Sequence, residues 1–350
     1  MLSGMGLRIV VIGGGTGLST LLHGLKPHVG TEIAAGDGIT AVVTVTDNGG
    51  SSGRLRQEFN MLPPGDIRNC MAALAEDEQL LTRLFQFRFT GDGTLGGHSF
   101  GNLFLTALTE AMGGDFLAAV KASSEVLAIK GRIFPSTMDH VEMVAELADG
   151  RTVHGEMQIA DSGSAITRVH LSCPDCEPLE ETLEAIASAD LIALGPGSLF
   201  SSVIPNLLVP GIPEAIAASK APVLYICNCM TQPGETTGFT IEDHLRALAE
   251  HSPLVAPEVV LVNALPISMA ARARYLEEGA AQVMLGFGRP DALPEAGERE
   301  ITLPGAMGRR ARLLSLNVID ESAVVRHDAV KLAGAVLDIA RRARARTAVF

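Results

Sequence analysis

The 350-residue sequence contains no tryptophan, only two tyrosines, and an aromatic content of 4%. Proteins that bind single-stranded nucleic acid stack bases on aromatic side chains, so this scarcity disfavours such a platform. Basic residues are also few, because Lys and Arg number 27 against 40 Asp and Glu, which gives a net charge of −13. A broad nucleic-acid footprint requires a basic face, so we expect no nucleic-acid partner.

Long apolar runs are missing as well. No stretch approaches the roughly 18 consecutive apolar residues that span a bilayer. The N-terminus leads into a predicted strand without a basic region or a cleavage site. We therefore expect a cytoplasmic protein with no membrane insertion.

The cysteines do not suit a disulfide scaffold, because there are five of them in a large chain. Cys173 and Cys176 have the spacing of a zinc knuckle, and Cys227 and Cys229 would share one face of a strand. A zinc site would require the two pairs to meet, and we favour free thiols packed as small apolar groups. No metal is therefore assigned.

Three common catalytic or nucleotide-binding signatures are also absent, namely G-x-x-x-x-G-K-[ST], H-E-x-x-H and G-x-S-x-G. For this reason no catalytic residue is assigned. Asp47 would become one only if the protein were a transferase.

What the sequence does contain is a repeated order of apolar strand, glycine-rich turn and helix. Strands are predicted near residues 7–12, 39–47, 190–198, 221–228 and 257–264. This alternation predicts an α/β fold with a Rossmann-like, doubly wound and mostly parallel sheet.

The pattern changes between about residues 63 and 171, where helical stretches precede two alternating strands around an Ala-Asp-Gly-Arg turn. We predict a single domain over residues 1–346, with its sheet core at about 7–62 and 172–346. The segment at about 63–171 is predicted to be an inserted lobe of helices and a β-hairpin. Residues 288–311, rich in Gly, Pro and charge, are predicted to form a surface loop.

The glycine cluster after the first strand raises the question of a cofactor. A dinucleotide fingerprint would place a third glycine where Leu18 stands and an acid about twenty residues on, whereas Asp47 lies thirty residues beyond Gly17. We therefore favour a phosphate-bearing ligand over NAD, because glycine turns before a helix aim free amides at phosphate. A second turn of this kind follows the strand near residue 194. The two turns contribute the candidates Gly14, Gly15, Thr16, Gly17, Gly195, Gly197 and Ser198.

Residues 46–59 follow the second strand and are predicted to form a glycine- and serine-rich loop at the carboxyl end of the sheet. Asp47 and Asn48 offer oxygens to a ribose, a metal or a substrate hydroxyl. Ser51 and Ser52 are expected to donate to phosphate oxygens.

Two further blocks place polar residues at helix starts. Asp66 is the expected cap of a helix after Pro63-Pro64-Gly65, with Arg68 in its first turn. His98 and Asn102 stand in another glycine-framed turn, where a role toward a ligand and a purely structural role are both open.

Seven blocks together resemble one family: VVIGGGTGL, VTDNGGSSGRLR, PPGDIRN, GHSFGNL, GPGSLFSSVIPNLLVPGI, YICNCMTQPGET and VVRHD. The chain resembles the bacterial gluconeogenesis factors, within the CofD-like superfamily of 2-phospho-L-lactate transferases, from about Arg8 to the last helix. The resemblance implies a CofD-like fold, a homodimer, and a cytoplasmic role in cell shape and in growth on gluconeogenic carbon sources. It also implies binding of UDP-sugars, UDP-N-acetylglucosamine in particular, and regulation of a protein partner that the sequence does not identify.

The resemblance also carries over individual residues. Tyr275 and Arg326 match ligand-linked positions of the family, and Asn228 lies in one of the shared blocks. The chain departs from relatives at Asn48, where a second acid is common, and at Ala329, where some have a phosphorylatable threonine. The loss of the second acid weakens a metal-dependent transferase interpretation.

Two main hypotheses follow. The first is a sensor that binds a UDP-sugar without turnover. The second is a transferase in which Asp47 orients an acceptor hydroxyl and Mg²⁺ offsets the charge of a nucleotide diphosphate. No resident cofactor is otherwise assigned, and a nicotinamide-dependent oxidoreductase is disfavoured by the missing glycine.

Overall fold

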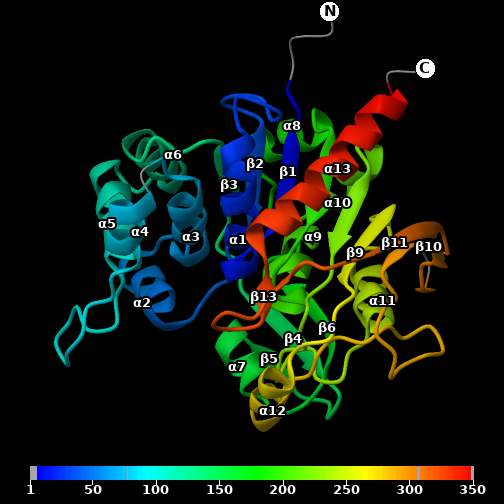
Figure 1. Ribbon diagram of the computed structural model, residues 1–350. Coiled ribbons are helices and arrows are strands. Elements are labelled where there is room, and N and C mark those ends of the chain that lie inside the picture. Colours follow the sequence, from blue (N-terminus) through cyan, green and yellow to red (C-terminus); the bar gives the residue numbers. More distant parts are fainter. Residues whose placement is uncertain (1–5, 77, 306–307, 348–350) are drawn as a thin grey trace, which may run out of the picture.

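An eight-stranded sheet runs through the centre of the molecule (Figure 1). The computed structural model describes residues 6–76, 78–305 and 308–347. The parts of the predicted domain at residues 1–5 and 77, and of the predicted loop at 306–307, lie outside these described residues.

The sheet order is β10-β11-β9-β8-β7-β1-β2-β3, and seven of these eight strands pair in parallel with at least one neighbour. From β3 to β9 this is the order of a doubly wound nucleotide-binding fold, which confirms the predicted fold class. The strands are β1 Ile9–Gly13, β2 Ile39–Val43, β3 Arg132–Pro135, β7 Leu191–Leu194, β8 Val223–Ile226, β9 Val259–Asn263, β10 Gly297–Thr302 and β11 Arg310–Leu316.

The central strands are buried on both faces, as their continuous apolar sequences predict. Helices cover the sheet, and α1 packs against both α3 and α13 (Figure 1). The helices are α1 Gly15–Leu25, α2 Gly50–Phe59, α3 Gly65–Leu74, α4 Glu78–Gln86, α5 Phe100–Ala111, α6 Phe116–Val126, α7 Glu156–Ala160, α8 Glu180–Ala187, α9 Ile204–Leu207, α10 Ile212–Ala218, α11 Ile241–His251, α12 Met269–Glu277 and α13 Ala329–Thr347, with a 3₁₀ turn at Lys26–His28 and a π-helical turn at Leu199–Val203.

The predicted insertion contains the helices α3 to α6 and the predicted antiparallel hairpin. Strands β4 Met143–Leu147 and β5 Thr152–His154 form that hairpin, and β6 Ile166–Leu171 completes a small three-stranded sheet. Strand β3 lies within the same stretch of sequence, but it pairs with β2 as an edge strand of the main sheet. The chain therefore returns to the main sheet in the middle of the segment predicted as an inserted lobe.

The prediction of a loop over residues 46–59 is wrong beyond residue 49, because α2 begins at Gly50. Local tertiary contacts explain the helix. The backbone N–H of Gly49 donates to the carboxylate of Asp47 at 2.8 Å. The Leu55 side chain is buried in the protein interior. Glycine- and serine-rich composition alone does not report such contacts.

The prediction of a surface loop over residues 288–311 is wrong for part of its length, because β10 pairs antiparallel with β11 at the sheet edge. Cross-strand ion pairs join the exposed faces of this hairpin. Arg310 pairs with Glu300, and Arg312 pairs with Glu298 at 3.1 Å. Both ion pairs join diagonal positions of the strand register, which long side chains can reach, and the charges keep the edge strand polar.

Within the described ranges, no single helix is both long and apolar enough to cross a bilayer. One bent pair, Leu199–Leu207 with Ile212–Ala218, passes that test only when its two parts are joined, and only by length and composition.

The contact between α1 and α13 depends on a glycine. A Cβ at Gly24 would lie 2.1 Å from the carbonyl oxygen of Ala329, the first residue of α13. No heavy atom lies within 4 Å of the corresponding point at Gly334, which is also in α13.

We predict that Gly24→Ala lowers the free energy of unfolding by roughly 2 kcal/mol, because the helix backbones must move apart. Urea denaturation followed by circular dichroism measures the change. As a control, Gly334→Ala should leave stability equal or raise it by up to about 1 kcal/mol, since alanine favours a helix. Equal effects of the two substitutions would contradict the proposed close contact.

Candidate functional site

A hollow of about 490 Å³ lies at the carboxyl ends of the central strands. It is formed by the segments that follow β1, β2, β7 and β8, so it sits where the strand order reverses between β1 and β7. Ligands of open α/β sheets bind at this switch point. We call it the rim hollow; its lining is Gly14, Gly15, Thr16, Gly17, Asp47, Asp66, Glu156, Pro196, Gly197, Ser198, Ser202, Asn228, Cys229, Met230, Thr231, Gln232, Pro233, Tyr275, Glu278, Ala280, Val325 and Arg326.

The two glycine turns touch each other in this hollow. A Cβ at Gly17 would lie 2.6 Å from the carbonyl oxygen of Pro196, and one at Gly197 would lie 3.1 Å from the carbonyl oxygen of Gly14. Gly15 has a φ of +64°, which glycine adopts readily. Only glycines allow these two turns to approach so closely.

Asp66 lies beside the first glycine turn. It does not cap α3 as predicted, because α3 begins at Gly65 after Pro64 without a side-chain cap. The Asp66 carboxylate instead accepts a hydrogen bond from the backbone N–H of Gly15. Burial is the main cause that raises the pKa of Asp66 to about 6, and the nearby charge of Asp47 adds to it.

Glu156 is a second half-buried acid in the rim hollow, and the sequence did not identify it. It begins α7 and hydrogen-bonds to Ser201. Ser201 Oγ also donates to Glu235 at 3.0 Å, which places two carboxyl groups on one hydroxyl. Burial is the main cause that raises the pKa of Glu156 to about 8, and it also raises the pKa of Glu235.

Asp47 and Asn48 follow β2, but only Asp47 lines the hollow. The Asn48 side chain turns toward α7, where its Oδ1 accepts from the backbone N–H of Met157 at 3.3 Å. Asn48 therefore anchors the helix that presents Glu156.

A chain of side chains links the second glycine turn to the segment after β8. Gln232 Nε2 donates to Ser198 Oγ at 2.6 Å, and Gln232 Oε1 accepts from Asn228 Nδ2 at 3.4 Å. The three polar groups therefore form a preorganised edge of the hollow. Gln232 also was not predicted, although it stands in the TQPGET block.

Tyr275 and Arg326 come from the C-terminal third of the chain and close the hollow on another side. The Tyr275 hydroxyl accepts from the backbone N–H of Val325 at 2.8 Å, and the Arg274 guanidinium lies 5.3 Å from the centre of the Tyr275 ring. Arg326 lies in β13 Arg326–His327, which pairs with β12 Ile319–Asp320. Its Nε lies 3.4 Å from the Asp320 carboxylate, and its side chain is 55% exposed.

The other predicted site residues lie outside the lining of the rim hollow. These are Asn48, Ser51, Ser52, Arg68, His98, Asn102 and Gly195.

Ser51 and Ser52, predicted to donate to phosphate, are buried in the first turn of α2. Ser51 Oγ lies 2.9 Å from His98 Nδ1 and accepts from Asn102 Nδ2 at 3.0 Å. Burial is the main cause that lowers the pKa of His98. This buried network joins α2 to α5. The Ser51 hydroxyl, the His98 ring and the Asn102 amide therefore have hydrogen-bond partners within the protein.

Arg68 and Gly195 also do not line the hollow. Arg68 Nη2 donates to Asn69 Oδ1 at 2.7 Å, and burial lowers the pKa of its guanidinium. Gly195 has a φ of +79° and turns the chain after β7 toward Gly197.

The side chains do not form a metal centre by themselves. Across residues 6–76, 78–305 and 308–347, no group of three or more His, Cys, Asp or Glu is arranged to hold a metal ion. Mg²⁺ is commonly held by one or two carboxylates together with substrate phosphates. Mg²⁺ therefore stays a prediction tied to a phosphate ligand, and Asp47 and Asp66 are two of the acids that line the hollow.

Comparison with known proteins places the chain among close relatives. A family model described as 2-phospho-L-lactate transferase CofD matches residues 9–296. The chain is 48% identical to a putative gluconeogenesis factor of Nostoc sp. over 95% of its own length and 68% of that protein. It is 44% identical to a gluconeogenesis factor of Halalkalibacterium halodurans over 95% of this chain and 96% of the other.

The fold is likewise similar to solved structures. A crystal structure of a protein from Bacillus halodurans superposes with a TM-score of 0.85 at 44% identity, covering 95% of this chain and 99% of that one. A second crystal structure, of a UPF0052 family member from the same organism, gives a TM-score of 0.84 at 43% identity over 96% and 100% of the two chains.

We predict that Glu156 makes stability fall as pH rises from about 4.5 to about 8. Its pKa is raised in the folded state, so the native protein holds a proton there that the unfolded chain releases, and ionisation then opposes folding. Glu156→Gln cannot ionise and should exceed the wild type in unfolding free energy at pH 9 by on the order of 2 kcal/mol. Urea denaturation at pH 5, 7 and 9 measures this.

Glu278→Gln serves as the control, because Glu278 lines the same hollow but is exposed. It should leave the pH dependence of the wild type unchanged. If the unfolding free energies of the wild type and Glu156→Gln changed with pH in parallel, the pKa of Glu156 would not be raised in the folded protein.

Proposed function

We propose that this chain binds a nucleotide sugar in the rim hollow and acts as a regulator. The chain belongs to the CofD family and, within that family, to the gluconeogenesis factors. The ligand we propose is UDP-N-acetylglucosamine. The observation that carries this proposal is the meeting of two glycine turns at the switch point of the sheet, with Arg326 and Tyr275 across the same hollow.

The chemistry of the lining supports a ligand with both phosphate and hydroxyl groups. The turn at Gly197 and Ser198 and the Arg326 guanidinium suit a diphosphate, since an arginine can fork onto phosphate oxygens. The carboxylates of Asp47 and Asp66 suit hydroxyl groups of a ribose or a sugar, because ionised carboxylates accept hydrogen bonds. A nucleotide sugar carries both kinds of group.

A regulatory role is supported by where the lining residues come from. Tyr275 and Arg326 belong to α12 and β13, and the Tyr275 hydroxyl holds the backbone at Val325. A ligand that contacts this pair alters a C-terminal segment as well as the glycine turns. We propose that a protein partner reads this change, in a cytoplasmic homodimer linked to cell shape and to growth on gluconeogenic carbon sources.

One observation favours a second candidate, a CofD-like transferase. Asp66, with its pKa raised to about 6, lies in the hollow beside Asp47. A carboxylate that titrates near neutral pH can act as a general base. In this candidate Asp47 orients an acceptor hydroxyl, and a nucleoside monophosphate leaves the nucleotide diphosphate.

Calorimetric titration with UDP-N-acetylglucosamine, with and without Mg²⁺, tests the proposal while chromatography follows any product. We expect saturable binding of the intact nucleotide sugar, with no turnover. Arg326→Gln should weaken the affinity at least tenfold, because it removes the cationic fork. Asp320→Asn keeps the guanidinium but breaks its ion pair, so it should retain binding.

Arg272→Gln is the charge-matched control, because Arg272 is exposed on α12 and does not line the hollow. Its affinity should match that of the wild type. Absence of saturable heat would overturn the proposed ligand, and equal affinity of Arg326→Gln and the wild type would overturn the site. Release of a nucleoside monophosphate with an added acceptor would establish the transferase instead.

A further inference from the structure

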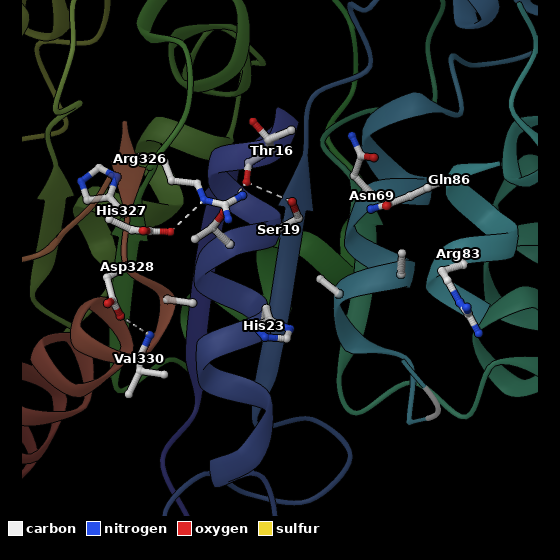
Figure 2. Close-up of a pocket in the computed structure, with 15 residues that line it drawn as sticks. Thr16, Ser19, His23, Asn69, Arg83, Gln86, Arg326, His327, Asp328 and Val330 are labelled. Carbon is white, nitrogen blue, oxygen red and sulfur yellow. Dashed lines mark hydrogen bonds and ion pairs between the residues drawn. The ribbon is translucent and has the colours of Figure 1, made fainter. Parts of the chain in front are cut away.

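A second and larger hollow, of about 810 Å³, lies along the outer face of α1 (Figure 2). Its floor is α1, one wall is formed by α3 and α4, and the other by β13 and the start of α13. We call it the α1 groove; its lining is Thr16, Ser19, Thr20, His23, Asn69, Ala72, Ala73, Arg83, Gln86, Asp320, Arg326, His327, Asp328, Ala329 and Val330. Its volume falls within the range of small-molecule sites, about 300–1,000 Å³.

The floor of the groove is a stripe of polar residues on a helix whose other side is core. Thr16, Ser19, Thr20 and His23 are spaced at i, i+3, i+4 and i+7, which places them on one face. Ser19 Oγ and Thr20 Oγ1 both donate to the carbonyl oxygen of Thr16, at 3.0 and 2.8 Å. Because their protons are used inside the helix, their lone pairs remain as acceptors for hydroxyl groups of a ligand.

Cationic groups stand on the two opposite walls. Arg326 extends from β13 toward the Thr16 end of α1, whereas Arg83 belongs to α4 on the far side (Figure 2). Asp320 and Asp328 also line the groove; Asp320 pairs with Arg326 at 3.4 Å and Asp328 with Lys331 at 3.5 Å, and both also accept backbone hydrogen bonds. Asp320 accepts from Ser322, and Asp328 accepts from Val330 and Lys331 at the start of α13.

We infer that the α1 groove is a second ligand site, distinct from the rim hollow, that binds a sugar phosphate. Arg326 holds the phosphate at the Thr16 end of the groove, and the hydroxyl stripe on its floor accepts from the sugar. Asn69 Oδ1 is already occupied by Arg68, so the Asn69 amide nitrogen is the group with which this wall can donate. Nothing in this assignment depends on a nucleotide sugar in the rim hollow.

The two hollows share Thr16 and Arg326. One guanidinium cannot fork onto phosphates in both places at once, so occupation of the groove draws Arg326 away from the rim hollow. The coupling between the two ligands is therefore negative, and each ligand weakens the other by the same factor.

Calorimetry with glucose 6-phosphate as the probe, without any nucleotide, tests the groove. We expect saturable binding that exceeds the binding of inorganic phosphate or of glucose, because both halves of the ligand are recognised. Arg326→Gln and Thr20→Val should each weaken it at least fivefold. Thr20→Val keeps the shape of the side chain and removes its hydroxyl, that is, the acceptor lone pairs and the hydrogen bond donated to the Thr16 carbonyl.

Two matched controls separate this from a general loss of structure. Arg272→Gln removes an exposed arginine outside the groove, and Thr31→Val removes a hydroxyl that, like that of Thr20, donates to a nearby backbone carbonyl. Both should bind glucose 6-phosphate like the wild type. Affinity unchanged by Arg326→Gln and Thr20→Val, or equal affinity for inorganic phosphate and glucose 6-phosphate, would overturn the assignment.

The coupling is measured by repeating the UDP-N-acetylglucosamine titration with saturating glucose 6-phosphate. A rise in the apparent dissociation constant of at least threefold in the wild type, lost in Thr20→Val, is expected. An unchanged constant in the wild type would overturn the sharing of Arg326. If the nucleotide sugar does not bind at all, the proposed function fails while the first titration still decides the groove.

Discussion

The close contact between the turns after β1 and β7 is the constraint on which the site depends. Gly17 leaves room for the carbonyl of Pro196, and Gly197 leaves room for the carbonyl of Gly14. Because the two turns touch, the segments after four strands surround one hollow instead of opening onto separate surfaces. A side chain at Gly17 would push α1 away from β7 and would also displace Thr16, which both hollows share.

Within that hollow, electrostatics set a second constraint. Asp66 and Glu156 are carboxyl groups whose pKa values burial raises toward neutrality, and Arg326 is the cationic side chain that lines the same space. A diphosphate next to ionised carboxylates is unfavourable unless a proton or a cation offsets the charge. An anionic ligand of this hollow would therefore favour the protonated form of these acids, so we expect its binding to be accompanied by proton uptake.

Much of the fold could be predicted from the sequence, and the reasons are local. The apolar strand before Gly13 and the glycines after it specify β1, the turn and α1 through short-range pattern alone. The start of α2 could not be predicted in the same way, because it depends on the Asp47 contact and on burial of Leu55. The site residues show the same difference between local sequence pattern and tertiary contact. Glu156 has no local sequence signal, and tertiary contacts of α7, such as that with Asn48, bring it to the hollow. Ser51 stands in a sequence typical of a phosphate-binding loop, but its hydroxyl is hydrogen-bonded to His98.

The ring of Tyr275 is already covered on one side, since Arg274 lies over it, and its hydroxyl is tied to the backbone at Val325. A planar group of a ligand can therefore stack only on the other face of the Tyr275 ring. The ring would then lie between the ligand and the Arg274 guanidinium. Stacking of this kind senses the area of a base but not the pattern of its edge. For the proposed nucleotide sugar, discrimination between uracil and another pyrimidine would then fall to amides near that edge, and Asn228 and Gln232 are amides that line the same hollow.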